Sequence, residues 1–94
     1  MKDRFEIAAD LREIAGLLKL KGENPFKAQA YERGAAALEK LDNDLSALVK
    51  ARRLQQIPGV GSALAAIIEE IYLTDECWLL EQLRTSLPPG AAEL

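Results

Sequence analysis

Apolar residues recur over the first twenty positions with the period of an amphipathic helix. They are spaced by four, three and four residues: Ile7, Leu11, Ile14 and Leu18. This spacing places them on one face of a helix with 3.6 residues per turn. Acidic residues lie early in the segment and lysines late, as the helix macrodipole favours. The pattern predicts a helix from about Asp3 to Leu20 that ends before Gly22.

A second helix is predicted from Pro25 to about Lys40. Asn24 followed by Pro25 is a helix-start signal, because asparagine caps the first free N–H groups and proline is favoured at the first helical position. Four residues form its expected buried line: Ala28, Tyr31, Ala35 and Leu38. Gly34 costs about 1 kcal/mol of helix propensity relative to alanine. A glycine at that position therefore predicts close contact with another helix.

The second half of the chain predicts shorter helices separated by polar breaks. They are expected at 45–50, at 52–56, from Ser62 to about Leu73, and from Asp75 to about Thr85. Ser62 and Thr74 are the expected N-caps of the last two, and the run 87–90 is expected to end the final helix. The period-2 alternation of strands is absent. We therefore expect an all-α fold: a compact bundle of about four principal helices with short extra helical turns.

The segment Ile57-Pro58-Gly59-Val60-Gly61 predicts a tight turn between two of these helices. Pro58 fixes φ and ends the preceding helix. Gly59 and Gly61 permit positive φ and leave room for a ligand to approach the backbone, while Val60 is expected to hold the turn to the core. Such a turn directs N–H groups outward at a helix N-terminus, which favours an anion such as a nucleic-acid phosphate. The alternative is a tight turn that binds no ligand.

Composition narrows the classes of function. The 94 residues suffice for one small domain, and a single cysteine with no histidine argues against an internal disulfide, a zinc site or a histidine-based triad. No apolar stretch is long enough to span a bilayer and the first residues form no secretory signal, so we expect a cytoplasmic protein without a membrane partner. The net charge is −3, and residues 51–94 hold three arginines against six acids. Any nucleic-acid contact must therefore be local.

Two stretches together resemble the N-terminal 8-kDa domain of the DNA polymerase X family, the family of DNA polymerase beta, and in particular its bacterial branch. The first is Asn24-Pro25-Phe26-Lys27-Ala28-Gln29-Ala30-Tyr31, and the second runs from Leu54 to Ile68. The resemblance implies a helical DNA-binding domain over 1–87 with a helix-hairpin-helix motif at 52–73, followed at 88–94 by a tail or the start of a linker. It also implies the N-terminal part of a longer polymerase, a transferase, in a bacterial cytoplasm at the nucleoid.

The function implied by this resemblance is binding of DNA without sequence specificity, at the phosphate backbone and at the 5′-phosphate of gaps or nicks during repair synthesis. The implied partners are gapped or nicked DNA and the polymerase domains of the parent chain, and we expect a monomer. Lys27 matches a 5′-phosphate-binding lysine, Tyr31 the tyrosine beside it, and Phe26 a side chain that stacks on a template base. Without the resemblance, Lys27 could also be a solvated surface lysine and Tyr31 a core tyrosine.

The resemblance also assigns roles to the hairpin backbone. The N–H groups of the turn match those that grip a DNA phosphate: Gly59, Val60, Gly61, Ser62 and Ala63. Three carbonyls match those that hold a monovalent cation, Na⁺ or K⁺, together with a DNA phosphate: Gln55, Ile57 and Val60. No other cofactor is expected.

Several members of that family remove a 5′-deoxyribose phosphate through a Schiff base with a lysine. The matching position here is Ile67, and two further basic positions are Ala63 and Leu79. We therefore expect no catalytic residue in this chain, and no polymerase activity because a carboxylate cluster for two metal ions is absent. Two alternatives stay open: a lyase that uses an atypical amine, Lys27 or the N-terminus, and a protein-interaction module that has lost DNA affinity.

Overall fold

The computed structural model describes residues 2–42 and 44–86 and has no β-strand within them. The helices follow in the order α1 (Arg4–Leu20), α2 (Pro25–Glu39), α3 (Leu45–Lys50), the 3₁₀ helix η1 (Leu54–Gln56), α4 (Ser62–Thr74) and α5 (Trp78–Ser86). This confirms the expected all-α fold, with α1, α2, α4 and α5 as the principal helices. The predicted end of the final helix at 87–90 and the tail at 88–94 lie outside the described residues.

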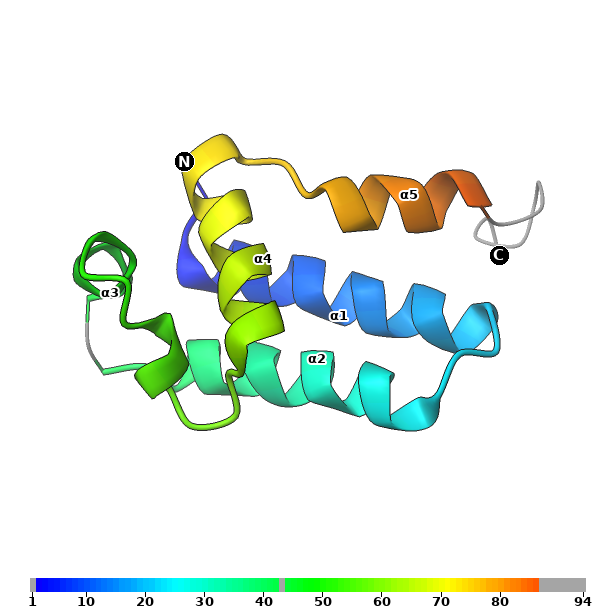
Figure 1. The fold of residues 1–94 in the computed structure, drawn as a ribbon, viewed down its shortest axis with the longest axis horizontal. Helices are drawn as coiled ribbons and strands as arrows, with labels where there is room; N and C mark the ends of the chain where they lie inside the picture. Colours follow the sequence, from blue (N-terminus) through cyan, green and yellow to red (C-terminus); the bar gives the residue numbers. More distant parts are fainter. Residues whose placement is uncertain (1, 43, 87–94) are drawn as a thin grey trace.

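The long helices α1 and α2 form an antiparallel pair on which the other helices pack (Figure 1). They share the most extensive contact of any two elements in the described chain. α5 lies along α1 on the side away from α2, α4 crosses the pair, and α3 lies beyond the C-terminal end of α2. None of the described helices is long and apolar enough to span a membrane.

The ends of α1 are fixed by local hydrogen bonds. Asp3 accepts a hydrogen bond from the N–H of Glu6 at 2.8 Å, and the Glu6 carboxylate accepts one from the Asp3 N–H at 3.3 Å. This reciprocal capping box starts the helix. At the other end Gly22 has a φ of +76° and its N–H donates to the carbonyl of Lys19, which confirms it as the residue that ends α1.

Gly34 makes room on α2 for a side chain of α4. Asn24 caps α2 by accepting a hydrogen bond from the Phe26 N–H at 2.9 Å, as predicted. Gly34 is buried, and a Cβ added to it would lie 3.1 Å from Cδ1 of Leu64 on α4. The missing side chain therefore makes room for Leu64 of the helix that follows the hairpin, which is the crowded contact that a glycine within a helix pattern predicts.

Three predicted helix boundaries are wrong. The N-cap of α4 is Gly61 and not Ser62. Ser62 is the first helical residue, and no side chain forms a capping hydrogen bond at this end of the helix. α4 extends to Thr74 and ends at Asp75 in the left-handed conformation, so α5 begins at Trp78 and Thr74 does not cap it. Arg52 has a positive φ and Arg53 precedes η1, so the first helix of the hairpin contains only Leu54–Gln56.

Candidate nucleic-acid interface

The hairpin is held to the domain by apolar side chains, and this leaves much of its backbone at the surface. Ile57 and Val60 are buried, whereas Pro58, Gly59 and Gly61 are exposed. The Val60 N–H donates to the Ile57 carbonyl at 3.0 Å and closes the turn. The buried side chains of Ile57 and Val60 therefore fix the turn, as expected for Val60. The backbone of Pro58 and Gly59 between them faces solvent.

The first turn of α4 presents N–H groups without an acceptor. The N–H of Ala65 donates to the Gly61 carbonyl at 2.9 Å, which is the first hydrogen bond of the helix. Within the described residues no hydrogen bond is formed by the preceding N–H groups: Gly59, Gly61, Ser62, Ala63 and Leu64. Helix N-termini carry a partial positive charge and free donors. This arrangement suits a bound anion such as a phosphate.

The two glycines of the hairpin differ in what they contribute. Gly59 has a φ of +91°, where a side chain strains the backbone. Gly61 has a φ of −87°, which any residue adopts, and a Cβ at Gly61 would have no neighbour within 4 Å. The expected positive φ is therefore found at Gly59 and is wrong for Gly61. At Gly61 the backbone does not require a glycine, and the feature that remains is the open surface around the residue.

The three carbonyl positions expected to bind a cation lie on one short stretch of chain. Gln55 belongs to η1 and is exposed. The Ile57 carbonyl accepts the turn hydrogen bond from Val60 and keeps a second lone pair, since a carbonyl oxygen carries two. The donor set is neutral oxygen, which suits a hard, weakly charged cation.

Phe26 and Lys27 lie at the exposed start of α2. The Phe26 side chain is 72% exposed. The Lys27 ammonium lies 3.8 Å from a carboxylate oxygen of Glu23, and its side chain is 63% exposed. Such a loose surface pair contributes little to stability. Lys27 thus retains the freedom to pair with an anion of higher charge.

Tyr31 lies one turn after Lys27 on α2. Its ring is partly buried and packs against the hydrophobic core. Burial raises the pKa of its hydroxyl, with a smaller contribution from Cys77. In the part of the chain that the structure describes, this hydroxyl forms no hydrogen bond, so a protonated donor remains available.

The positions that carry basic residues in related lyases are apolar here and partly belong to the core. Ile67 and Leu79 are partly buried against the hydrophobic core, while Ala63 is exposed in the first turn of α4. None of these side chains supplies an amine. Within residues 2–42 and 44–86 no group of three or more cysteine, aspartate or glutamate residues is placed to hold a metal ion.

Salt bridges pair some of the cations and leave others unpaired, so the unpaired positive charge is unevenly placed. The sequence alone did not predict this feature. Among the described residues, five cations form salt bridges with carboxylates: Lys2 with Asp10, Arg12 with Glu39, Lys19 with Glu32, Lys27 with Glu23 and Arg84 with Glu13. Over the described residues four cations without a salt bridge border the hairpin or a hollow that the hairpin lines: Arg33, Lys40, Arg52 and Arg53. The hairpin is therefore locally basic although the chain is acidic.

Two hollows flank the hairpin. One, of about 590 Å³, lies between α2 and the turn and is lined by Arg33, Lys40 and Gly59 among others. The second, of about 260 Å³, is lined by Arg52, Gln55, Ser62 and Glu69 among others. Each side of the turn thus combines exposed backbone with an unpaired cation.

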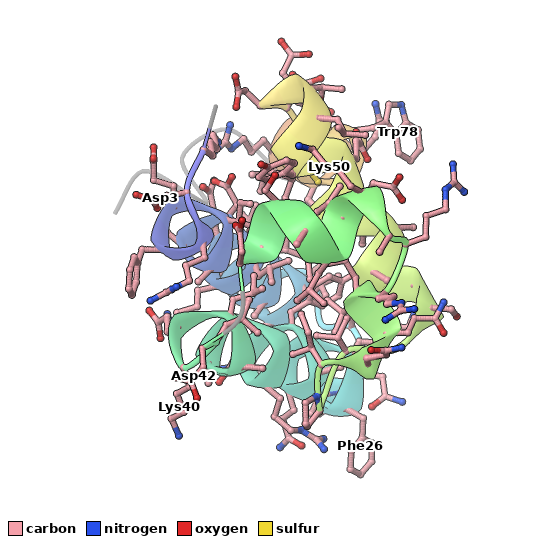
Figure 2. The ribbon with its side chains drawn as sticks, turned by 90° about the vertical axis from the view of Figure 1, so that its left-hand side faces the viewer. Asp3, Phe26, Lys40, Asp42, Lys50 and Trp78 are labelled. Atoms are coloured by element: carbon pink, nitrogen blue, oxygen red, sulfur yellow. The ribbon has the colours of Figure 1, made fainter. Side chains whose placement is uncertain are left out.

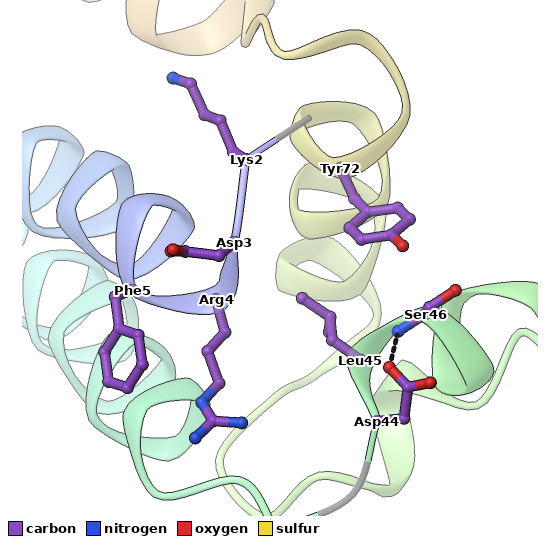
Figure 3. A pocket seen from close by; sticks show the side chains of 8 residues that line it. All are labelled: Lys2, Asp3, Arg4, Phe5, Asp44, Leu45, Ser46 and Tyr72. Atoms are coloured by element: carbon purple, nitrogen blue, oxygen red, sulfur yellow. Dashed lines mark hydrogen bonds between the residues drawn. The ribbon is translucent and has the colours of Figure 1, made fainter.

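A further hollow of about 470 Å³ lies away from the hairpin, between the start of α1 and α3 (Figure 3). The Arg4 guanidinium carbon lies 4.9 Å from the centroid of the Phe5 ring. Two acidic residues of the lining, Asp3 and Asp44, cap α1 and α3. The carboxylates are therefore engaged in holding helix ends, and we assign this hollow no ligand.

Comparison with known proteins relates the same part of the chain to a described family. Residues 2–77 match the family model described as helix-hairpin-helix domain. The chain is also 34% identical over 84 residues to DNA polymerase/3′-5′ exonuclease PolX of Bacillus subtilis (strain 168). The match covers 89% of this chain and 14% of that protein, so the chain corresponds to a small part of the length of this relative.

Proposed function

Since the chain belongs to the helix-hairpin-helix domain family, in the form found in X-family DNA polymerases, we propose that it binds the DNA backbone and holds the 5′-phosphate at gaps or nicks during repair synthesis. DNA binding in the context of a polymerase X chain follows from the family. The observation that carries the proposal is the set of unpaired N–H groups at Gly59 and from Gly61 to Leu64, which lie beside unpaired arginines.

Such a grip is independent of sequence. Backbone N–H groups and arginines hydrogen-bond to phosphate oxygens, which are the same at every nucleotide. The electrostatic contribution comes from few cations, because the net charge is −3. We therefore expect weak affinity with a shallow salt dependence, because the slope is proportional to the number of phosphates that are contacted.

The 5′-phosphate is proposed to bind at Lys27 and Tyr31, with Phe26 stacking on a base. A terminal phosphate carries more negative charge than an internal one, and the first turn of α2 adds the favourable end of the helix dipole. The Lys27 ammonium leaves its loose contact with Glu23 at small cost. Neutral Tyr31 then donates to a phosphate oxygen.

We further propose that Na⁺ or K⁺ joins the carbonyls of Gln55, Ile57 and Val60 to a DNA phosphate. The neutral oxygens of this turn fit such an ion, and the described residues offer no carboxylate cluster for a divalent one. The ion supplies positive charge between two sets of oxygen atoms. The affinity for DNA should then be lower in a buffer whose cation is a large organic ion than in a K⁺ buffer of equal ionic strength.

A fluorescence anisotropy titration at low salt tests the 5′-phosphate site. One gapped duplex is prepared with and without the downstream 5′-phosphate, and the Lys27→Ala variant is compared with Lys50→Ala as a matched control. Tighter binding of the phosphorylated duplex, lost only in Lys27→Ala, supports the site. Equal binding of both duplexes by the unmodified chain contradicts it and leaves a generic grip by the hairpin.

The same titration distinguishes the other functions considered. Absence of binding to every duplex favours a protein-interaction module. Borohydride trapping on abasic DNA separates binding from lyase chemistry, since only a Schiff base with an amine is reduced to a stable adduct. Because Ile67 lacks an amine, we expect no adduct.

A further inference from the structure

Two large apolar side chains lie close together at the surface, where α4 ends and α5 begins. Leu73 is 61% exposed and Trp78 is 64% exposed. The carboxylate of Glu70 accepts a hydrogen bond from the Trp78 N–H at 2.7 Å, and Leu73 follows Glu70 by one turn on the same face of α4. Neighbouring exposed apolar side chains mark an interaction surface, whereas single ones are ordinary. We name the surface formed by Glu70, Leu73, Glu76 and Trp78 the α4–α5 corner.

The corner is held in shape by the segment that joins the two helices. The Thr74 hydroxyl donates to the Glu70 carbonyl at 2.7 Å and accepts a hydrogen bond from the Glu76 N–H at 3.2 Å. Asp75 ends α4 in the left-handed conformation, and Cys77 is buried in the core. A surface that is already ordered loses little conformational entropy when a partner covers it.

The charge around the corner is negative. Residues 59–83 include five acidic side chains and no lysine or arginine. Over the part of the chain that the structure describes, neither Glu70 nor Glu76 forms a salt bridge. Lys50 is drawn on the same upper side of Figure 2 as Trp78, but it too has no carboxylate within salt-bridge distance in those residues. The domain itself therefore does not neutralise the corner.

From these observations we propose that the α4–α5 corner docks a basic segment of a partner protein, one that carries lysines or arginines beside a large apolar side chain. The apolar side chain packs against Trp78 and Leu73, and the cations lie beside Glu70 and Glu76. Tryptophan is enriched in protein interfaces because its ring buries a large area and carries a polar N–H. The opposite charges of the two surfaces speed and orient their encounter.

The charge of the corner favours this partner over DNA and over a second copy of the chain. Unpaired carboxylates repel phosphates. A second copy has a net charge of −3, and a twofold contact through the corner would bring like charges together.

The corner is also remote from the hairpin. The two lie at opposite ends of α4 (Figure 1), whose 13 residues span about 20 Å at 1.5 Å per residue. The domain can therefore hold DNA and the partner together, and the inference does not depend on the proposed function.

The test uses three synthetic helical peptides of equal length as probes. The first presents leucines on one face and lysines on the other. In the second each lysine is replaced by glutamate, and in the third each leucine is replaced by serine. Trp78 is the only tryptophan of the chain, so its fluorescence reports directly on the corner, and the anisotropy of labelled peptide gives the affinity for each variant.

The leucine–lysine peptide should bind saturably and shift the Trp78 emission to shorter wavelength, because the ring becomes covered, and neither control peptide should do so. Trp78→Ala should lose about tenfold in peptide affinity. Glu70→Gln should lose about two- to threefold, since glutamine keeps an acceptor for the Trp78 N–H but removes the charge. Phe26→Ala is the matched control, because it removes an exposed ring on the opposite side of the molecule (Figure 2). It should leave the peptide affinity unchanged, and melting temperatures check that each variant is folded.

Four results overturn the inference. The first is the absence of a saturable shift with the leucine–lysine peptide. The second is an equal loss in Trp78→Ala and Phe26→Ala, which would show that the peptide is held by the overall negative charge. The third is a dimer of the unmodified chain that Trp78→Ala dissociates, which would assign the corner to a second copy.

The fourth is weaker binding of a blunt DNA duplex by Trp78→Ala, which would assign the corner to the DNA interface. The duplex titration also separates the two proposals. If the unmodified chain binds the peptide at Trp78 but binds no DNA, the proposed function fails and the inference is supported.

Discussion

Gly34 on α2 lies directly beneath Leu64 on α4, where an added Cβ would be 3.1 Å from Cδ1 of the leucine. Gly34→Val should destabilise the domain by about 1–3 kcal/mol, because extra methyl groups force side chains and backbone apart in a packed core. Chemical denaturation gives this free energy of unfolding. The displaced α4 should also weaken DNA binding.

Gly16 supplies the matched control. It lies within α1 but has no neighbour within 4 Å of an added Cβ. Gly16→Ala should stabilise by about 0.5–1 kcal/mol, through better helix propensity. If Gly34→Val and Gly16→Val have equal effects, close packing at Gly34 is unimportant.

The two hairpin glycines should separate stability from binding. Gly59→Ala should cost about 1–2 kcal/mol of folding free energy, because its φ of +91° is unfavourable for alanine. Gly61→Ala should leave stability within about 0.5 kcal/mol, since its φ is −87° and its surroundings are open. It should nevertheless weaken DNA binding by obstructing the approach to the N–H groups.

Denaturation curves and anisotropy titrations on the same preparations check this separation. A folded Gly61→Ala that binds DNA as tightly as the parent chain would exclude the backbone around Gly61 from the interface. A large loss of stability in that variant would show a strain that φ does not reveal.

The Arg12–Glu39 pair should make stability depend on acid pH. Two hydrogen bonds of 2.6 and 2.7 Å join the guanidinium to the carboxylate, and they lower the pKa of Glu39 below its ordinary value of 4.5. A lowered folded-state pKa means that the pair stabilises above pH 4.5 and that this contribution is lost as the pH falls through the folded value. The Glu39→Gln variant should therefore have a lower melting temperature than the parent chain at pH 7 and the same melting temperature at pH 2.

A thermal-melting series from pH 7 to pH 2 on four chains checks this: the parent, Arg12→Ala, Glu39→Gln and the double variant. The coupling between the two substitutions should disappear with the carboxylate charge. Coupling that persists at pH 2 would show that packing, and not charge, connects α1 to α2 at this point.

Cys77 should report the opening of α5. Burial is the largest influence that raises the pKa of its thiol above the ordinary value of 9.0, and the residue is 4% exposed. Iodoacetamide at pH 8 should therefore react far more slowly with the folded chain than with the chain in denaturant. Stability should also fall above pH 9, where the unfolded thiol ionises before the folded one, and Cys77→Ala should remove that fall.

Alkylation rates measured with increasing denaturant check the first part. A rate in buffer equal to the rate in full denaturant would contradict a buried thiol. Unchanged alkaline stability in Cys77→Ala would assign any decline above pH 9 to other groups.

The sequence predicts α1 and α2 well because their signals are local. Gly22 and Asn24 mark helix ends through hydrogen bonds to the nearest few residues, and both act as expected, while Asp3, expected at the start of the first helix, is its N-cap. The junction of α4 and α5 was not predictable in the same way. Asp75 ends α4 in the left-handed conformation, which aspartate adopts only where the surrounding structure favours it.

The hairpin could be inferred from five consecutive residues, whereas the unpaired cations around it could not. Which cations remain unpaired is decided by contacts between distant residues. Glu39 and Lys40 are neighbours in the sequence, yet Glu39 pairs with Arg12 of α1 and leaves Lys40 free.

The way α5 joins the domain implies an order of assembly. α1 and α2 are consecutive and share the largest contact, so their pairing closes a very short loop. α5 packs mainly on α1, and its Arg84 pairs with Glu13 across a separation of 71 residues. Contacts this far apart in the chain form late, because a long loop must close first. Hydrogen exchange should therefore show the amides of α5 losing protection before those of α1 and α2, with the hairpin still formed in the partly opened state.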